Sequence, residues 1–369
     1  LLAVVSIGHA VAFELDEMQT DDLRLLYFDP LQTYLTPHAA RSFHNSLAFQ
    51  KQIFDWTPWE KTTVILTDFR DYGNAAAGVV PNNSIQIDIA PLSRAYETFS
   101  ASERIYLDMN HELVHVATGD VWSQQDAWWR RVFLGKPTPD QAHPESIIYF
   151  YLASPRVAAP RWYAEGSATF METWMAGGLG RAQGPFDEMV FRAMVRDGAH
   201  FYSNLGLVSE GTKVDFLVGV NAYLYGTRFF SYLALHYTPE RVIEWLKRGE
   251  GSRRYYASQF EHVFGKGLEE AWDEWIAWEH KFQQANLASV RQHPLTQARK
   301  LVDRGLGSVS RSFVDPVKKR LIGAFRYPGV LAHVGGLSLE DGSVERLRDV
   351  KGPMLYRVTS TAFDADSRT

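Results

Sequence analysis

The spacing of hydrophobic positions in the first hundred residues predicts a mixture of strands and one helix. The helix covers 38–54, which contains Phe43, Leu47 and Ile53. Residues 71–83, which contain Gly and Asn, are expected to form a loop. Short apolar or alternating runs, typical of strands, occupy three segments: 23–28, 62–67 and 85–89.

After residue 100 the pattern becomes helical and then changes again near residue 300. The stretch 119–160, rich in proline and aromatic residues, is expected to be irregular. Residues 300–369 return to short alternating runs, and Asp341-Gly342 between two of them indicates a hairpin. Further helices are predicted over 161–176, 185–197, 222–237, 239–248 and 267–282.

These patterns predict an α+β fold with an N-terminal mixed sheet, a mostly helical C-terminal half and a β-rich tail. The 369 residues suffice for two or three domains. The tail is too short to form a closed propeller or barrel by itself. The predicted domains are an N-terminal α+β subdomain, a helical subdomain and the β-rich segment, covering 13–99, 100–290 and 300–369.

Residues 1–12 have the pattern of a signal-peptide remnant. They are apolar, and Ala10-Val11-Ala12 fits a cleavage site followed by polar residues. The alternative is a buried N-terminal strand. No later stretch approaches the roughly 18 apolar residues of a membrane span. We therefore expect an exported protein, located in the periplasm or cell envelope of a bacterium, with no membrane span in the mature chain.

Composition excludes several kinds of site and partner. There are no cysteines, so disulfides, zinc–thiolate sites and thiol nucleophiles are ruled out. The net charge is −5, and no basic stretch with interleaved aromatics occurs, so nucleic acid is not an expected partner.

The most specific chemical signal is the motif HExxH at His111-Glu112-Leu113-Val114-His115. On a helix, the two histidines lie one turn apart on one face, where two neutral imidazoles can share one Zn²⁺. The intervening Glu112 can then take a proton from water beside the metal. The alternative is that both histidines are ordinary half-buried side chains.

The context of the motif is helical. Ser100 and Glu103 fit a capping box, and Gly119 is the predicted stop. Between them, apolar residues recur at spacings of three and four, at Ile105, Tyr106, Met109, Leu113 and Val116.

A catalytic zinc site needs a third protein ligand. A histidine six residues after His115 would complete another known pattern, but that residue is Val121. The best candidate is Glu165, which lies on an apolar helix and next to Gly166, a small residue that lets two helices approach closely. The alternatives are a solvent-facing Glu165 and a ligand role for His143, which precedes a proline.

HELVH followed by a W-x-x-E-G-x-A helix resembles the gluzincin metallopeptidases, the clan that includes thermolysin and the M1 aminopeptidases. The resemblance implies a zincin fold, with His111, His115 and Glu165 as zinc ligands and Glu112 as general base. It also implies that 116–160 is an insertion, which we expect to serve as a lid. The β-rich tail resembles the first strands of propeller-like domains found after such peptidases in some bacterial envelope proteins.

Two further features are similar to that clan. Tyr223, in a Y-x-x-G-x-x-F pattern, matches the tyrosine that helps to stabilise the oxyanion, and Tyr225 is the fallback. The 74–78 and 85–89 segments precede the zinc helix, where zincins place the edge strand that binds substrate. Glu172, two turns after Glu165, is expected either on the helix surface or as an acceptor for the outer nitrogen of a ligand histidine.

The predicted function is zinc-dependent hydrolysis of peptide or protein substrates. The alternative from another class is a non-catalytic envelope protein that keeps the fold as a binding or assembly platform, with the tail contacting an envelope partner. Hydrolysis of a non-peptide amide or ester also stays open.

Overall fold

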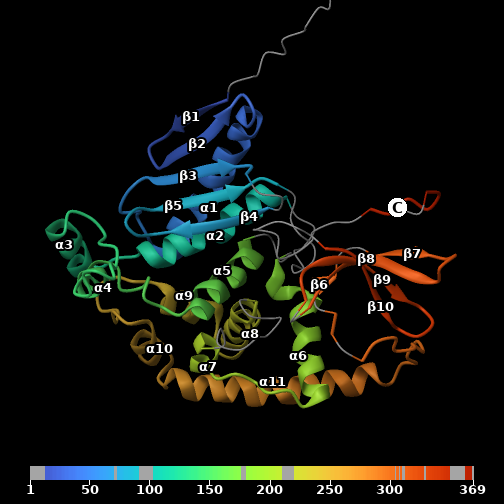
Figure 1. Ribbon diagram of the computed structural model, residues 1–369. Coiled ribbons are helices and arrows are strands. Elements are labelled where there is room, and N and C mark those ends of the chain that lie inside the picture. The colour runs from blue at the N-terminus through green and yellow to red at the C-terminus, as the bar shows by residue number, and fades with distance from the viewer. Residues whose placement is uncertain are drawn as a thin grey trace, which may run out of the picture. The chain divides into compact units, whose positions relative to one another are not determined.

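Figure 1 shows the computed structural model of the chain. It describes residues 13–69, 73–90, 103–175, 180–209, 220–303, 305–306, 308–309, 312–327, 330–349 and 362–367, so the segment 1–12 lies outside the described residues. None of the helices within these ranges is long and apolar enough to cross a membrane.

The contacts within the chain divide it into two compact units. The first unit comprises 1–90, 102–159 and 239–264, and the second comprises 91–101, 160–238 and 265–369. Each unit thus takes segments from separate parts of the sequence. The boundaries of the three predicted domains stay a prediction.

The first unit contains a five-stranded mixed sheet with the strand order β1-β2-β3-β5-β4. The predicted strands 23–28, 62–67 and 85–89 are confirmed as β2, β3 and β5, which run parallel to one another. The edge strands β1 and β4 run antiparallel to their neighbours. The strands are β1 (Glu14–Gln19), β2 (Leu23–Asp29), β3 (Thr62–Thr67), β4 (Asn74–Gly78) and β5 (Ser84–Asp88).

The edge strand β1 was not predicted, and β4 was indicated by the family resemblance but not by the hydrophobic pattern. The expected loop over 71–83 is wrong for 74–78, because this segment is β4. It was missed because its three central residues are alanines, which pair with β5 through the backbone without an apolar side-chain pattern. In β1, all residues except Met18 are exposed, so the hydrophobic signal of a strand is absent there too.

Helices α1 and α2 pack against each other and against this sheet (Figure 1). The expected irregular stretch 119–160 is partly wrong, because it contains α3 and α4. Helix α3 begins with a capping box of Ser123 and Asp126, and α4 is an unbroken apolar run without helical spacing. The helices of the first unit are α1 (Thr36–Phe54), α2 (Arg104–Asp120), α3 (Gln124–Val132), α4 (Ser146–Ala153), α9 (Pro239–Leu246) and α10 (Tyr256–Phe264); a 3₁₀ turn, η1 (Thr33–Leu35), precedes α1.

The second unit contains a group of helices packed around aromatic side chains. The predicted helices 185–197 and 222–237 are confirmed as α6 and α8, and 267–282 is confirmed as part of the longer α11. Buried rings fill the space between them, among them Trp162, Tyr225, Phe229, Trp272 and Trp275. The helical elements are α5 (Arg161–Met175), η2 (Arg181–Gln183), α6 (Pro185–Asp197), α7 (Asn204–Ser209), α8 (Asn221–His236) and α11 (Leu268–Val290).

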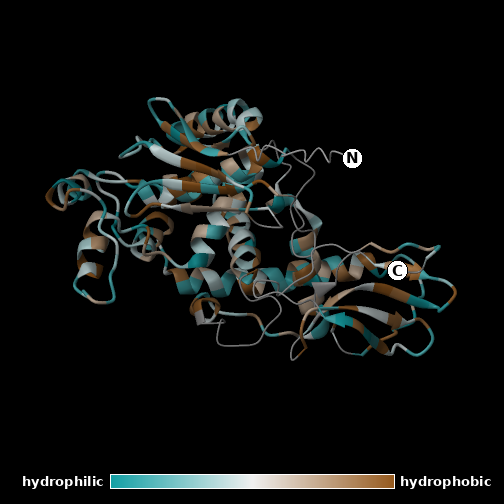
Figure 2. Ribbon diagram, turned by 45° about the horizontal axis from the view of Figure 1, so that its top comes forward, coloured by the Kyte–Doolittle hydropathy of each residue, from teal (hydrophilic) through white to brown (hydrophobic). Residues whose placement is uncertain are grey.

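The β-rich tail is an antiparallel sheet in the order β10-β9-β8-β6, with β7 also paired to β8. The hairpin predicted at Asp341-Gly342 is confirmed, since β9 and β10 pair antiparallel across it and Gly342 has a φ of 73°. In Figure 2, helices and strands alternate between hydrophobic and hydrophilic residues, as expected of elements with one buried side. The strands are β6 (Ser308–Val309), β7 (Phe313–Asp315), β8 (Arg320–Arg326), β9 (His333–Ser338) and β10 (Val344–Asp349).

Candidate metal centre

The helix that carries HExxH begins with a different cap from the predicted one. The N-cap is Glu103, whose carboxylate accepts hydrogen bonds from the backbone N–H groups of Ile105 at 3.1 Å and Tyr106 at 2.7 Å. A carboxylate at this position also complements the positive end of the helix dipole. Ser100 lies outside the described residues.

Gly119 does not stop the helix, which continues to Asp120. A Cβ at residue 119 would lie 2.8 Å from Cγ2 of Val79 and 3.3 Å from Cγ2 of Val157. The glycine therefore serves close packing of the last helical turn, and the prediction that it ends the helix is wrong.

The two histidines of the motif face each other. His111 is buried and His115 is partly exposed. Their Nε2 atoms are 3.2 Å apart and their rings are inclined at 82°. In a tetrahedral site with Zn–N distances of about 2.0–2.1 Å, two ligand nitrogens lie about 3.3 Å apart. The observed spacing fits that geometry.

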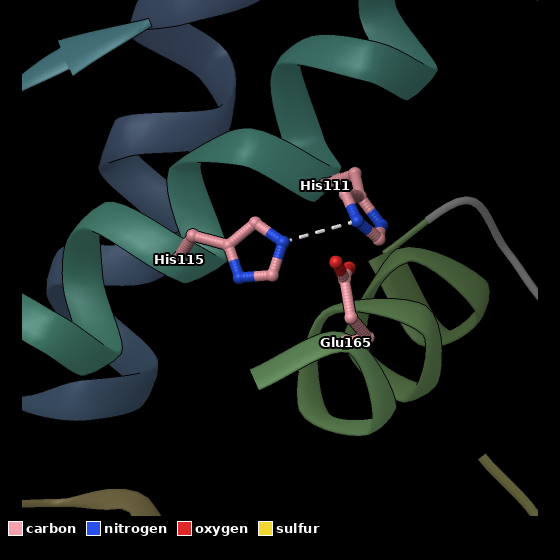
Figure 3. Close-up of side chains that lie close together, drawn as sticks. All are labelled: His111, His115 and Glu165. Carbon is pink, nitrogen blue, oxygen red and sulfur yellow. Dashed lines mark hydrogen bonds between the residues drawn. The ribbon is translucent and has the colours of Figure 1, made fainter. Parts of the chain in front are cut away.

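Glu165 joins these histidines. One ligand atom from each of His111, His115 and Glu165 lies within 4.8 Å of the other two. Figure 3 shows the Glu165 carboxylate, carried by α5, pointing toward the two imidazoles. Two imidazoles and one carboxylate are the donor set of a catalytic zinc site, which keeps a fourth position open. The residues present thus fit a zinc ion.

Within the second unit, a contact between two glycines places α5 and α8 very close together. A Cβ at Gly166 would lie 2.6 Å from the backbone of Gly226, and a Cβ at Gly226 would lie 2.3 Å from the Trp162 carbonyl oxygen. The small size of Gly166 therefore serves the approach of α8 to α5. This contact brings Tyr223, one turn before Gly226, next to Glu165 on the neighbouring helix.

Tyr223 is surrounded by charged groups. Burial raises the pKa of Tyr223, and the neighbouring Glu165 carboxylate raises it further. The Arg161 Nε lies 3.3 Å from Oε1 of Glu165. The guanidinium carbons of Arg161 and Arg181 lie 5.5 and 5.2 Å from the centre of the Tyr223 ring.

Tyr225, the fallback for the oxyanion role, belongs to the aromatic core of the second unit. Its ring is nearly parallel to that of Trp272, at 7°, and its hydroxyl oxygen accepts a hydrogen bond from the Tyr202 backbone N–H at 3.3 Å. The structure thus favours Tyr223 over Tyr225 as the tyrosine near Glu165.

The other candidates lie elsewhere. The side chain of His143 is 69% exposed and lies 3.5 Å from Glu145, and among the described residues it belongs to no potential metal-binding group. Glu172 is fully buried and pairs with Arg181, so the prediction of a helix-surface position is wrong.

Asp108 is a residue of the site that the sequence reasoning missed. Burial raises the pKa of Asp108 to about 6, against the opposing effect of Arg104, whose Nε lies 3.4 Å away. The nearby Glu112 carboxylate raises it further. Its position four residues before Glu112 was the available signal, because residues i and i+4 share a helix face.

No family model matches the chain, and no curated protein matches it. A distantly similar solved structure is that of an aminopeptidase N family protein from Idiomarina loihiensis, with a TM-score of 0.35 and 12% sequence identity. The alignment covers 76% of this chain and 44% of that one, so the chain spans less than half the length of that protein. A likeness at this level establishes neither the fold family nor the activity.

Proposed function

We propose that this protein is a zinc-dependent peptidase in which His111, His115 and Glu165 hold the metal. The observation that carries the proposal is the meeting of these three side chains within 4.8 Å, next to a buried glutamate between the two histidines. A bound zinc would act as a Lewis acid that polarises a water molecule and lowers its pKa toward about 7.

Glu112 is the proton acceptor in this proposal. It takes a proton from the water that attacks the peptide carbonyl and returns it to the leaving amine. The low exposure of Glu112, 6%, limits competing hydration of its carboxylate. Asp108 lies on the same helix face, four residues before Glu112, and the Glu112 carboxylate raises the pKa of Asp108.

Tyr223 donates a hydrogen bond to the carbonyl oxygen as negative charge develops on it. A donor of this kind is effective only while it keeps its proton, and the raised pKa of Tyr223 keeps the hydroxyl protonated at neutral pH.

A peptide fits this proposal because β4 is the last strand of the N-terminal sheet as described. An extended peptide can pair with such an edge through its backbone, and the small side chains of Ala75, Ala76 and Ala77 leave room for those of the peptide. Export to the periplasm or cell envelope is part of the proposal and rests on the sequence of residues 1–12 alone.

The test compares hydrolysis of a peptide library by the wild type and by Glu112→Gln. The substitution keeps the shape of the side chain and removes its basicity, so we expect about a 10³–10⁴-fold loss of rate with unchanged zinc content. Glu145→Gln is the control, since this glutamate is exposed and lies apart from the metal group, and we expect full activity.

Two results would contradict the proposal. Equal rates for Glu112→Gln and wild type would mean that another group is the base. Cleavage of esters or small amides with no cleavage of any peptide would contradict the peptidase activity but not the metal site.

A further inference from the structure

The side chain of Arg181, which has no part in the proposed chemistry, is held by an ion pair with Glu172 in the second unit. Its Nε and Nη2 atoms donate to the two carboxylate oxygens of Glu172 at 2.6 and 2.7 Å. Glu172 is fully buried and the Arg181 side chain is 15% exposed. A two-pronged ion pair of this kind fixes the plane of the guanidinium group as well as its position.

The backbone around Arg181 is fastened to the same helix. The N–H of Ala182 donates to the hydroxyl oxygen of Thr173 at 2.9 Å. Gly180 lies so close to α5 that a Cβ there would be 2.3 Å from the Cα of Thr173. Any side chain at 180 would push η2 away from α5, so this glycine is needed for the contact.

This arrangement places the Arg181 guanidinium group over the ring of Tyr223. Its central carbon lies over the aromatic ring, 5.2 Å from the ring centre. A cation at this distance attracts the ring face and resists its tilting or withdrawal, and the effect grows where water is excluded. The orientation of the ring fixes the phenolic C–O bond and so the position of the hydroxyl oxygen.

We propose that Arg181, held by Glu172, is a positioning residue that fixes the ring of Tyr223 so that its hydroxyl points at the developing oxyanion. The inference rests on the proposed function, in which Tyr223 is the oxyanion donor. Small misplacements of a catalytic group cost large factors in rate, so a side chain that only holds Tyr223 still affects turnover.

The chain offers a matched control in the same unit. Arg228 donates to the two carboxylate oxygens of Glu279 at 2.9 and 3.2 Å, and Glu279 is fully buried. The guanidinium carbon of Arg228 lies 5.4 Å from the centre of the Phe282 ring. The two pairs therefore share burial, charge and ring contact, but only one of the rings carries a hydroxyl group.

The experiment measures kcat and KM for Arg181→Lys and Arg228→Lys, each in the wild-type and Tyr223→Phe backgrounds. Lysine keeps the charge and loses the planar fork. We expect Arg181→Lys to lower kcat about tenfold with little change in KM, and to have no further effect once Tyr223 is phenylalanine. Arg228→Lys should leave kcat unchanged in both backgrounds. Glu172→Gln, which weakens the same ion pair, should repeat the result of Arg181→Lys.

A second measurement does not depend on activity. The ring signals of ¹³C-labelled tyrosine, with Tyr223 assigned through Tyr223→Phe, should shift or broaden in Arg181→Lys and stay unchanged in Arg228→Lys. An unchanged Tyr223 signal in Arg181→Lys would overturn the inference, and so would a tenfold loss of kcat that persists in the Tyr223→Phe background. If the wild type hydrolyses nothing, the proposed function fails, and the ring signal alone decides whether Arg181 positions Tyr223.

Discussion

The middle and the C-terminal end of α2 both bury polar side chains, but these side chains have different partners in the two regions. At the end, one carboxylate is surrounded by donors. In the middle, imidazoles and carboxylates are gathered on one face of the helix. The same helix therefore provides an internal comparison between polar groups that hold the fold and polar groups suited to chemistry.

The end of the helix is organised around Asp120, which is fully buried. Its carboxylate accepts from Nη1 of Arg130 at 2.9 Å and from Nζ of Lys136 at 3.0 Å. It also accepts from the backbone N–H of Trp59 at 2.8 Å and from the amide of Asn83 at 3.1 Å. Each carboxylate oxygen therefore has two donors, and this network connects Arg130 and Lys136, in the 116–160 segment, to Trp59 and Asn83 of the same unit. A lid role for this segment stays a prediction.

The middle of the helix places groups of like character together. Two imidazole nitrogens lie 3.2 Å apart at His111 and His115. Asp108 and Glu112 share a face, and the Glu112 carboxylate makes ionisation of Asp108 less favourable. The comparison teaches that burial alone does not mark a functional site. The mark is a set of ligand-type atoms that lie close enough together to share one cation.

The largest effect on stability is expected from Asp120→Asn. The change removes the charge that compensates Arg130 and Lys136, so we expect a loss of about 3–5 kcal/mol in the free energy of unfolding, measured with urea. Zinc content of the folded protein should not change. Glu60→Gln is the control at the partly exposed rim of the network, with an expected loss of about 1 kcal/mol or less. Loss of zinc with unchanged stability in Asp120→Asn would reverse the assigned roles of the two regions.

A smaller, pH-dependent effect is expected from Asp108→Asn in the metal-free protein. The pKa of Asp108 is about 6 in the folded state and 3.8 in the unfolded state, so the folded state binds the proton more tightly between these values. The contribution of Asp108 to stability is therefore present below pH 4 and is lost as the pH rises through 6. We expect Asp108→Asn to gain about 2–3 kcal/mol over wild type at pH 8 and almost nothing at pH 4.

Added zinc should reduce the stability difference between Asp108→Asn and wild type. A bound cation favours the ionised form of Asp108, so the gain at pH 8 should shrink when zinc is added. A gain that is equal at pH 4 and pH 8 would show that Asp108 is not held in an unfavourable charged state.

The smallest effect is expected from Gly119→Ala, at the well-satisfied end of the helix. Alanine favours the helix by about 1 kcal/mol over glycine, but its Cβ would press on the side chain of Val79, 2.8 Å away. We expect a net loss of about 1 kcal/mol in thermal unfolding experiments, with zinc content unchanged. A marked loss of zinc would show that the two regions of α2 are coupled.

The elements predicted best are those with a strong local hydrophobic pattern. The helix predicted over 185–197 and the strand predicted over 62–67 have the predicted bounds. Other elements were missed by the reading of the hydrophobic pattern. They include the exposed strand β1, the alanine strand β4 and the short helices α3, α4, α7 and α10. Their positions depend on pairing or packing partners that are remote in the sequence.

The candidate site also contains features that the sequence predicted and features that it did not. The facing of His111 and His115 follows from helix geometry, and the grouping of Glu165 with them agrees with the expectation drawn from the sequence. The ligand and catalytic roles of these residues stay predictions. The position of Arg181 was not predictable, because it depends on the contact of Gly180 with Thr173, and no local pattern indicates such a contact.

The most direct test of the central claim is the zinc content of purified protein, measured by elemental analysis without chelator. We predict about one zinc per chain in the wild type and in His143→Ala, near zero in His111→Ala and His115→Ala, and strongly weakened binding in Glu165→Ala. Wild-type protein without zinc would contradict the account. Loss of the metal in His143→Ala, together with its retention in Glu165→Ala, would show that the third ligand lies in the 116–160 segment.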